Sequence, residues 1–464
     1  MLKTDSIDIV IRKQRDFFSS GTTQDINFRK QQLKNLRNLI DDNENEILEA
    51  LHKDLKKTEF EGCLTAVIGA KIEIDYALKN INKWTKAKKV SVPIDQLPGK
   101  AFIQPQAKGV VLIISPWNYP FHLAIVPLVG AIAAGNCAII KPSELTPNTS
   151  KVIAKIINNN FDENYIRVIE GAKETSQKLL EQKFDHIFFT GGSSIGKIVM
   201  EAAAKHLTPV TLELGGKSPC IIDTNINVKE TAKRIAWGKF LNNGQTCVAP
   251  DYLLVNRQIK KELLEAIIEA TKNLYGDDPA TSPDYGRIVN HHHFNRLCAL
   301  LEPGKIVLGG QVIPEENYIS PTIIDEVSPD FPIMEDEIFG PILPILEYDR
   351  LEEAIAFINE RPRPLALYLF SNDKKQQKII VQKTISGGVC INHTIMHLGV
   401  LDLPFGGVGN SGMGSYHGKA SFDTFSHQKS VLKRSFFLGT DLLFPPYKDK
   451  LKWIKLGLCI KNNC

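Results

Sequence analysis

The segment from Gly109 to Ile140 contains no Asp, Glu, Lys or Arg, and it limits the possible folds more than any other part of the chain. A membrane-spanning helix needs about 20 unbroken apolar residues, whereas prolines, asparagines and a histidine interrupt this segment. The segment instead predicts a strand (GVVLIIS), a polar loop (PWNYP), a buried helix (FHLAIVPLVGAIAAG) and a second strand (CAIIK). This order is a βαβ unit, whose strands are covered on both faces and therefore form continuous apolar runs.

The alternation of strands and helices continues on both sides of residue 213. The runs YIRVIEG, HIFFTGG and TPVTLELGG lead up to this position, and CIIDT, YLLVN, GKIVLGG and GGVCIN follow it. Alternating elements of this kind predict parallel sheets with helices on both faces. A chain of 464 residues is too long for one core. We therefore expect two or three domains, with boundaries near 213 and 390.

The first hundred residues show two other patterns. Residues 1–80 are expected to be helical, because Leu33, Leu36, Leu39 and Ile40 recur at helical spacing. Segment 90–109 contains several prolines and suits an extended hairpin.

The net charge of +4 resides in the tail, because residues 448–464 carry five lysines and one aspartate. The rest of the chain is neutral overall, which argues against a nucleic-acid-binding face. The eight cysteines form no CxxC pair, and the N-terminus lacks the uninterrupted apolar core of a secretory signal. These features favour a reducing compartment, and we expect a cytoplasmic protein.

Two glycine motifs resemble nucleotide-binding signatures. GVGNSG (407–412) matches GxGxxG, but Pro404 and Phe405 precede it in place of a strand, so we interpret it as a loop or hinge. GGSSIGK (191–197) nearly matches a P-loop, but Ile198 stands where a magnesium-binding hydroxyl is required, which disfavours ATP chemistry. The same turn joins an apolar run to a long helix, a context that favours phosphate binding. A tight βα turn without a ligand is the alternative.

Four polar motifs follow predicted strands or glycine-containing loops. PWNYP contains Asn118, KPSE contains Lys141 and Glu144, TLELGGK contains Glu213, and GQTC contains Cys247. Ligands bind at the carboxyl edge of α/β sheets, where such residues meet. Each residue alone has an ordinary explanation, as a helix cap, a solvated charge or a small buried thiol.

Together these motifs resemble the aldehyde dehydrogenase superfamily. Their order and spacing match along nearly the whole chain, including EIFGPILP (337–344) and LPFGGVGNSGMGSYHGKASFDTFSH (403–427). The latter block, the short N-terminal region and the FPPY tail are most similar to the class 3 branch, which includes fatty aldehyde dehydrogenases. One departure is Gly192, where the family usually has Ser.

The resemblance implies an α/β fold with a Rossmann-like cofactor domain, a second α/β catalytic domain and a small bridging element. The expected parts are a NAD(P)-binding domain (1–80 and 105–212), a catalytic domain (213–390), a bridging and oligomerisation element with closing loops (81–104 and 391–440) and a basic amphipathic tail (441–464). It also implies a homodimer.

For catalysis, the resemblance assigns Cys247 as the nucleophile. An aldehyde does not readily release hydride directly, so a thiolate adds to the carbonyl first and forms a thiohemiacetal. Asn118 and the backbone N–H of Cys247 would stabilise the oxyanion. Glu213 would activate the water that hydrolyses the resulting thioester.

For the cofactor, the resemblance places Lys141 and Glu144 near the adenosine ribose and Glu337 at the nicotinamide ribose. The remaining expected contacts are Trp117, Gly191, Gly192, Ser193, Gly196 and Phe339. A carboxylate at Glu144 favours NAD, and NADP stays open because class 3 relatives often accept both.

Several alternatives remain open at this stage. A CoA-acylating enzyme, a cysteine-dependent ester hydrolase or a non-catalytic protein with the same fold would carry many of these motifs. NHHHF (290–294) is not expected to bind metal, because adjacent histidines on a helix point in different directions. His417 suits either structural packing or a substrate channel. We expect no nucleic-acid partner and a medium- or long-chain or otherwise bulky apolar aldehyde as substrate.

The tail permits two interpretations. Leu451, Ile454 and Leu458 recur at helical spacing among interleaved lysines, which suits peripheral contact with an anionic membrane through 448–464. Docking on the body of the protein or on a second subunit explains the same pattern.

Overall fold

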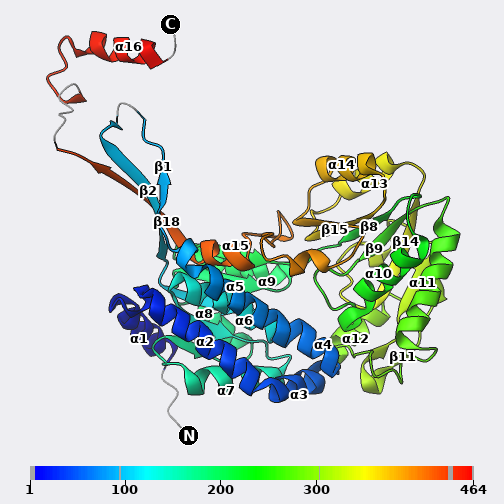
Figure 1. Cartoon of the computed structure of the whole chain (residues 1–464). Helices are drawn as coiled ribbons and strands as arrows, with labels where there is room; N and C mark the ends of the chain where they lie inside the picture. The colour runs from blue at the N-terminus through cyan, green and yellow to red at the C-terminus, as the bar shows by residue number, and fades with distance from the viewer. Residues whose placement is uncertain (1–5, 94–95, 303, 437–442, 462–464) are drawn as a thin grey trace. The chain divides into compact units, whose positions relative to one another are not determined.

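The computed structural model describes residues 6–93, 96–302, 304–436 and 443–461, with side chains described as far as Lys455 in the last range. The chain divides into two compact units (Figure 1). The first comprises Met1–Trp84 and Ala107–His427, and the second comprises Thr85–Gln106 and Gln428–Cys464. In the described ranges, no helix has both the length and the apolar composition needed to cross a membrane.

The first unit begins with the expected helices. They are α1 (Ile7–Ser19), α2 (Ile26–Asp42), α3 (Glu44–Leu55), α4 (Glu59–Gly62), the π-helix η2 (Cys63–Ile68) and α5 (Gly69–Trp84). The Asp25 side chain caps α2 by accepting a hydrogen bond from Asn27 N. Leu33, Leu36 and Ile40 are fully buried on one face of α2, which confirms the helical spacing.

The first sheet has six strands in the order β17-β7-β6-β3-β4-β5. The predicted strands are β3 (Val110–Ile114), β4 (Cys137–Lys141), β5 (Ile166–Val168), β6 (His186–Thr190) and β7 (Val210–Glu213), all parallel. The connecting helices are α6 (His122–Ala134), α7 (Pro147–Asn160), α8 (Lys173–Leu180) and α9 (Ser193–Ala204). The uncharged segment thus forms the predicted βαβ unit.

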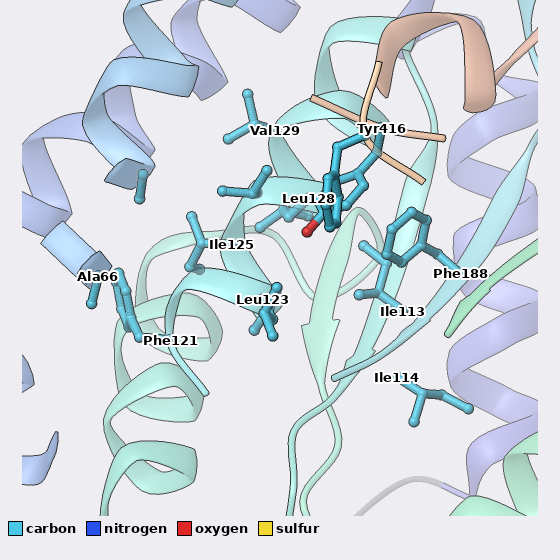
Figure 2. Close-up of a cluster of buried hydrophobic side chains, with 14 of the residues drawn as sticks. Ala66, Ile113, Ile114, Phe121, Leu123, Ile125, Leu128, Val129, Phe188 and Tyr416 are labelled. Atoms are coloured by element: carbon cyan, nitrogen blue, oxygen red, sulfur yellow. The ribbon is translucent and has the colours of Figure 1, made fainter. Parts of the chain in front are cut away.

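Helix α6 is apolar all round because the core surrounds it. Every residue from Leu123 to Ala134 is buried. A Cβ at Gly130 would lie 2.7 Å from the Cβ of Ser421 in α15 (Gly418–Thr424), so glycine permits that close approach. Figure 2 shows side chains of α6 and β3 in this core, together with Phe188 and Tyr416.

The second sheet has seven strands in the order β10-β13-β14-β9-β8-β15-β16. Its strands are β8 (Pro219–Ile222), β9 (Tyr252–Asn256), β10 (Lys305–Leu308), β13 (Thr322–Asp325), β14 (Ile342–Tyr348), β15 (Ala366–Phe370) and β16 (Gly388–Ile391). All are parallel except β10, which is antiparallel to β13. The associated helices are α10 (Val228–Phe240), α11 (Lys260–Tyr275), α12 (His291–Cys298), α13 (Leu351–Asn359) and α14 (Lys374–Lys383). A short hairpin, β11 (Val312–Ile313) and β12 (Tyr318–Ile319), lies outside both sheets.

The chain leaves the first sheet at Glu213 and enters the second at Pro219, close to the expected boundary near 213. Strand β16 runs through residue 390, the other expected boundary. Residues 391–427 group with the first unit, so the second unit is smaller than the bridging element expected from the sequence. The domain limits themselves stay predictions.

The second unit contains a three-stranded sheet in the order β1-β2-β18. β1 (Lys88–Val90) and β2 (Gly99–Ala107) pair antiparallel, with Lys89 opposite Phe102, which confirms the predicted hairpin. β18 (Ser426–Arg434) follows α15, and helix α16 (Lys450–Lys461) ends the described chain.

Candidate active site

The carboxyl ends of four strands in the first sheet lie in register. Ile114 of β3 pairs with Lys141 of β4 and with Phe189 of β6, and Thr190 of β6 pairs with Glu213 of β7. The loops that follow these strands therefore leave the sheet at one edge. Four predicted site regions share this edge: the Asn118 loop, Lys141, the 191–196 turn and Glu213.

Hydrogen bonds join the Asn118 loop to the segment that carries Cys247. Asn118 Nδ2 donates to Gln245 O at 3.0 Å. Asn242 Nδ2 donates to Asn118 O at 3.0 Å and to Gln245 O at 3.1 Å. All three residues are buried. The side-chain amide of Asn118 is therefore held by Gln245, which precedes Cys247 by two residues, and its orientation is fixed.

The segment before Cys247 has a left-handed backbone conformation at Asn242, Asn243 and Gly244. Asn242 and Asn243 have φ of 50° and 54°, and Gly244 has φ of 70°. Asn and Gly tolerate this left-handed region better than other residues. A Cβ at Gly244 would overlap Gly340 O. These three residues form the end of η4 (Leu241–Gly244). Gln245 follows them, and its carbonyl oxygen bonds Asn118 at the sheet edge.

Tyr119 forms a second connection that the sequence did not reveal. Its hydroxyl lies 2.8 Å from Thr246 Oγ1, beside Cys247. Lys57 Nζ lies 3.8 Å from the centroid of the Tyr119 ring and donates to Glu61 Oε1 at 3.2 Å. Lys57 is fully enclosed, and burial lowers the pKa of its ammonium. A buried cation–π contact thus supports the wall of the site.

The Cys247 thiol is half-buried and free. Burial raises the pKa of this thiol above its ordinary value, and the carboxylates of Glu337 and Glu213 raise it further. The N–H groups of Cys247 and Val248 act in the opposite direction. The resting sulfur is therefore a protonated thiol, and nucleophilic attack requires a proton acceptor.

Glu213 ends β7 and has a side chain whose two oxygens find no hydrogen-bond partner among the described residues. The residue is 2% exposed, and burial raises the pKa of its carboxyl well above the ordinary value. A carboxyl whose pKa is raised by burial is typical of residues that transfer protons in active sites. Its backbone is fixed, because Gly191 N donates to Glu213 O at 3.0 Å.

The glycine-rich segment 407–412 is the predicted loop, but its end has an unexpected role. Gly412 and Met413 form β17, a short strand antiparallel to β7 that places Gly412 opposite Glu213. A Cβ at Gly412 would overlap Leu212 O, so the position requires glycine.

The 191–196 turn has the shape of a phosphate cradle. Gly192 precedes the first turn of α9, and a Cβ there would find no atom within 4 Å. Ser193 begins the helix and is exposed, so the first N–H groups face open space. Gly196 allows α9 to pack closely, because a Cβ there would lie 2.7 Å from Leu214 Cδ2. The residues present therefore fit a pyrophosphate.

Lys141 and Glu144 form an ion pair after β4. Lys141 Nζ donates to Glu144 Oε2 at 2.6 Å. The lysine side chain is 3% exposed and the glutamate side chain is 42% exposed, so a buried ammonium supports an accessible carboxylate.

Glu337 and Phe339 lie on the side of the second sheet. Burial raises the pKa of the Glu337 carboxyl to about 8, and the Asp251 carboxylate adds to this effect, against the N–H of Gly216. A Cβ at Gly215 would overlap Glu337 Oε2. The absence of a side chain at Gly215, two residues after Glu213, therefore makes room for the Glu337 carboxyl.

Aromatic rings surround this position. Trp117 and Phe339 pack edge to face, with centroids 5.3 Å apart. His293 lies 5.1 Å from the Trp117 ring centroid, so one residue of the NHHHF run borders the site, which the sequence did not indicate. Among the described residues, no group of three potential ligands is placed to hold a metal ion.

Comparison with known proteins identifies the family of the chain. Residues 2–431 match the model of the aldehyde dehydrogenase family. The chain is 52% identical over 441 residues to the 4,4'-diaponeurosporen-aldehyde dehydrogenase of Staphylococcus aureus (strain NCTC 8325 / PS 47), with 95% of this chain and 96% of that protein covered. It is 49% identical over 460 residues to aldehyde dehydrogenase family 3 member A2 of Pongo abelii, covering 98% and 95% of the two chains.

Solved structures show the same fold. A substrate-bound structure of Staphylococcus aureus AldH superposes with a TM-score of 0.95 at 50% identity, covering 98% of this chain and 100% of that chain. An indole-3-acetaldehyde dehydrogenase complexed with NAD+ superposes with a TM-score of 0.84 at 26% identity, covering 92% and 88%. The predicted fold class is confirmed. The chain belongs to the aldehyde dehydrogenase family and is an aldehyde dehydrogenase.

Proposed function

We propose that this enzyme oxidises a medium- or long-chain, or otherwise bulky, apolar aldehyde to the carboxylic acid with NAD(P), and that Cys247 is its nucleophile. The observation that carries the proposal is the hydrogen bond from Asn118 to Gln245 O, which fixes an amide donor beside the cysteine. The names of the similar proteins support the substrate class, because they include a 4,4'-diaponeurosporen-aldehyde dehydrogenase and family 3 members.

In the first step the Cys247 thiol gives its proton to a water molecule, which passes it to solvent, and sulfur adds to the carbonyl carbon. The amide of Asn118 has two N–H groups, and one of them bonds Gln245 O. The other N–H and the backbone N–H of Cys247 stabilise the oxyanion of the thiohemiacetal. Fixed donors of this kind are worth about 3–4 kcal/mol each in hydrolases.

The residues fit a dinucleotide. The 191–196 turn would hold its pyrophosphate, Lys141 and Glu144 its adenosine ribose, and Glu337 its nicotinamide ribose, beside Phe339 and Trp117. When bound, NAD(P) supplies the hydride acceptor that converts the adduct into a thioester. Because Lys141 pairs with Glu144, the charge at that position does not exclude the 2′-phosphate of NADP.

Hydrolysis of the thioester is assigned to Glu213. Its carboxylate oxygens have no protein hydrogen-bond partner among the described residues, so they can accept a proton from water. The raised pKa of the Glu213 carboxyl favours retention of that proton once it has been accepted. This arrangement favours release by water over release by CoA.

The test measures NADH absorbance with a panel of aldehydes of increasing length, with and without CoA. Wild type is compared with Cys247→Ala and with Cys63→Ala, since both positions are half-buried free cysteines. We expect reduction without CoA, abolished only in Cys247→Ala. Reduction that requires CoA would support the acylating alternative. No reduction by wild type, together with ester cleavage that depends on Cys247, would support the hydrolase.

A homodimer that uses the second unit is proposed on the family resemblance and on the exposed side chains of its sheet, such as Leu432 and Val90. Size-exclusion chromatography with light scattering measures the mass. A monomer at assay concentration would contradict the proposal.

We also propose a cytoplasmic enzyme whose tail contacts membranes peripherally. Among the described residues of 448–464, Leu451 and Trp453 are exposed apolar side chains. In α16, lysines alternate with these residues around the helix, so the described part has no separate apolar and charged faces. The side chains of Leu458 and Lys461 lie outside the described residues. Equal co-sedimentation of full-length protein and a 1–447 truncation with anionic liposomes would end the idea.

A further inference from the structure

Three histidines and one glutamate lie beside the candidate active site without a role in the steps above. We call His122, His397, His417 and Glu73 the histidine cluster. The His417 ring centroid lies 6.5 Å from that of His122 and 5.5 Å from that of Phe405. The ring centroids of Phe405 and His397 lie 6.2 Å apart. Two of the imidazoles, His397 and His417, therefore pack against the Phe405 ring, and the third, His122, lies beside His417.

The histidine cluster adjoins the reacting residues on two sides. His122 lies four residues after Asn118 in the sequence and is the first residue of α6. His397 lies 6.1 Å from Tyr368, whose hydroxyl donates to Val248 O, next to Cys247.

Tyr416 gives a third connection. Its ring centroid lies 4.3 Å from that of His417. Burial raises the pKa of the Tyr416 hydroxyl, and the charges of Glu213 and Cys247 raise it further. These contacts link the histidine cluster to Tyr416 and, through Tyr368, to the backbone of Val248 next to Cys247.

Several ring nitrogens of the histidine cluster lack hydrogen-bond partners. Among the described residues, His122 Nδ1 and both ring nitrogens of His397 are buried without a hydrogen-bond partner. Burial lowers the pKa of His122 and His397 to about 4 and of His417 to about 3, so all three are neutral at working pH. Buried polar atoms without partners are rare in native proteins and require an explanation.

The surrounding chain holds these side chains in place. Glu73 is 3% exposed and accepts hydrogen bonds from Gly418 N at 3.0 and 3.3 Å. Its Oε1 lies 3.3 Å from His417 Nδ1. His417 has φ of 75°, a conformation that costs energy for a residue with a side chain. A Cβ at Gly69 would lie 2.9 Å from the His122 ring, so glycine makes room for that imidazole.

Metal binding does not explain the cluster, because no described group of three ligands is placed to hold an ion. A neutral imidazole presents one donor and one acceptor nitrogen, which complement a hydroxyl or carbonyl oxygen. The apolar neighbours are largely buried and include Leu123, Ile395 and Phe405. The polar neighbours are Lys57, whose charge acts on His122, and Ser421, whose hydroxyl accepts from His417 N. An apolar chain that carries one oxygen group matches these surroundings.

We propose that the histidine cluster binds a second oxygen function, hydroxyl or carbonyl, on the chain of the aldehyde substrate. This inference rests on the proposed function and narrows its substrate class to apolar aldehydes with one polar group remote from the reacting carbonyl.

The test compares kcat/KM for alkanals of increasing length with that for the ω-hydroxyalkanal of each length. We expect one narrow range of lengths at which the hydroxyl raises kcat/KM by about tenfold, the usual value of one well-placed hydrogen bond. His122→Val and His417→Phe should remove this preference. His206→Val serves as a matched control, because His206 is a histidine outside the cluster that bonds Glu181 O.

A second measurement needs no turnover. An ω-hydroxy acid of the preferred length should protect Cys247 from alkylation better than the plain acid in wild type, and equally well in His122→Val. Hydroxyalkanals that are no better than alkanals at any length, with alkanals oxidised normally, would overturn this inference alone. Absence of NADH with every aldehyde would instead overturn the proposed function. A preference that survives in both variants would also overturn the inference.

Discussion

The clearest quantitative prediction concerns Glu73, a carboxyl buried among apolar side chains. Burial raises its pKa from 4.5 to about 7, although the N–H of Gly418 acts in the opposite direction. The folded state therefore favours the protonated form. Below about pH 4.5 the carboxyl is protonated in both the folded and the unfolded state, and it affects stability little.

As pH rises, the unfolded chain releases the proton first, and stability falls until the folded carboxyl also ionises near pH 7. Each pKa unit corresponds to 1.36 kcal/mol, so the shift corresponds to about 3 kcal/mol of unfolding free energy lost between about pH 4.5 and 7. Glu73→Gln keeps an oxygen for Gly418 N and removes this titration. The variant should therefore gain about 3 kcal/mol on wild type across that window.

The assay is thermal unfolding of both proteins between about pH 5 and 8 at one scan rate. For a chain of this length, 3 kcal/mol moves Tm by roughly 3 °C. Other buried carboxyls, including Glu213, are present in both proteins and cancel in the difference. Glu201→Gln, at an exposed carboxylate, is the control and should give a flat difference. A flat difference for Glu73→Gln, or one that favours wild type as pH rises, would refute the reasoning.

Three further predictions follow from the site. Glu213→Gln should still form the acyl-enzyme but release it slowly, so stopped-flow absorbance should show about one NADH per site and then a rate at least tenfold below wild type. Gly215→Ala should displace the carboxyl of Glu337, since the new Cβ overlaps Oε2, and lower kcat/KM for NAD by tenfold or more. Lys57→Met should leave the buried Glu61 carboxylate without its cation and reduce unfolding free energy by about 3 kcal/mol in urea titrations.

Matched variants separate these effects from general damage. Gly399→Ala introduces a Cβ with no atom within 4 Å and should leave kcat/KM for NAD unchanged. Lys53→Met removes an exposed pair with Glu49 and should leave the urea midpoint unchanged. An unbroken steady rate in Glu213→Gln, or equal losses in both lysine variants, would contradict the assigned roles.

The sequence predicted those parts of the fold that depend on local patterns. Val110–Ile114 and Cys137–Lys141 are strands buried on both faces, so each is a continuous apolar run. Helical spacing in α2 and the prolines of the 90–109 hairpin are also local signals. The family motifs then suggested which polar residues to group, and the strand register brings Lys141 and Glu213 to one sheet edge.

The remaining contacts depend on partners far along the chain. Tyr119 bonds Thr246, and Glu73 accepts from Gly418 N, and neither pair has a spacing or composition that marks it. His293 belongs to a run for which the sequence analysis assigned no role, and its contact with Trp117 is visible only in the fold. Such polar and aromatic partners are selected by the assembled fold, so a single sequence carries no local signal for them.

Strand β17 has a consequence for the order of folding. The open edge of β7 is completed by Gly412 and Met413, which are synthesised about two hundred residues after it. During translation, the backbone beside Glu213 therefore lacks its antiparallel neighbour while the whole second sheet emerges from the ribosome. An unpaired strand edge readily joins another chain. Nascent chains that stall before residue 412 should therefore depend on chaperones more than the finished protein does.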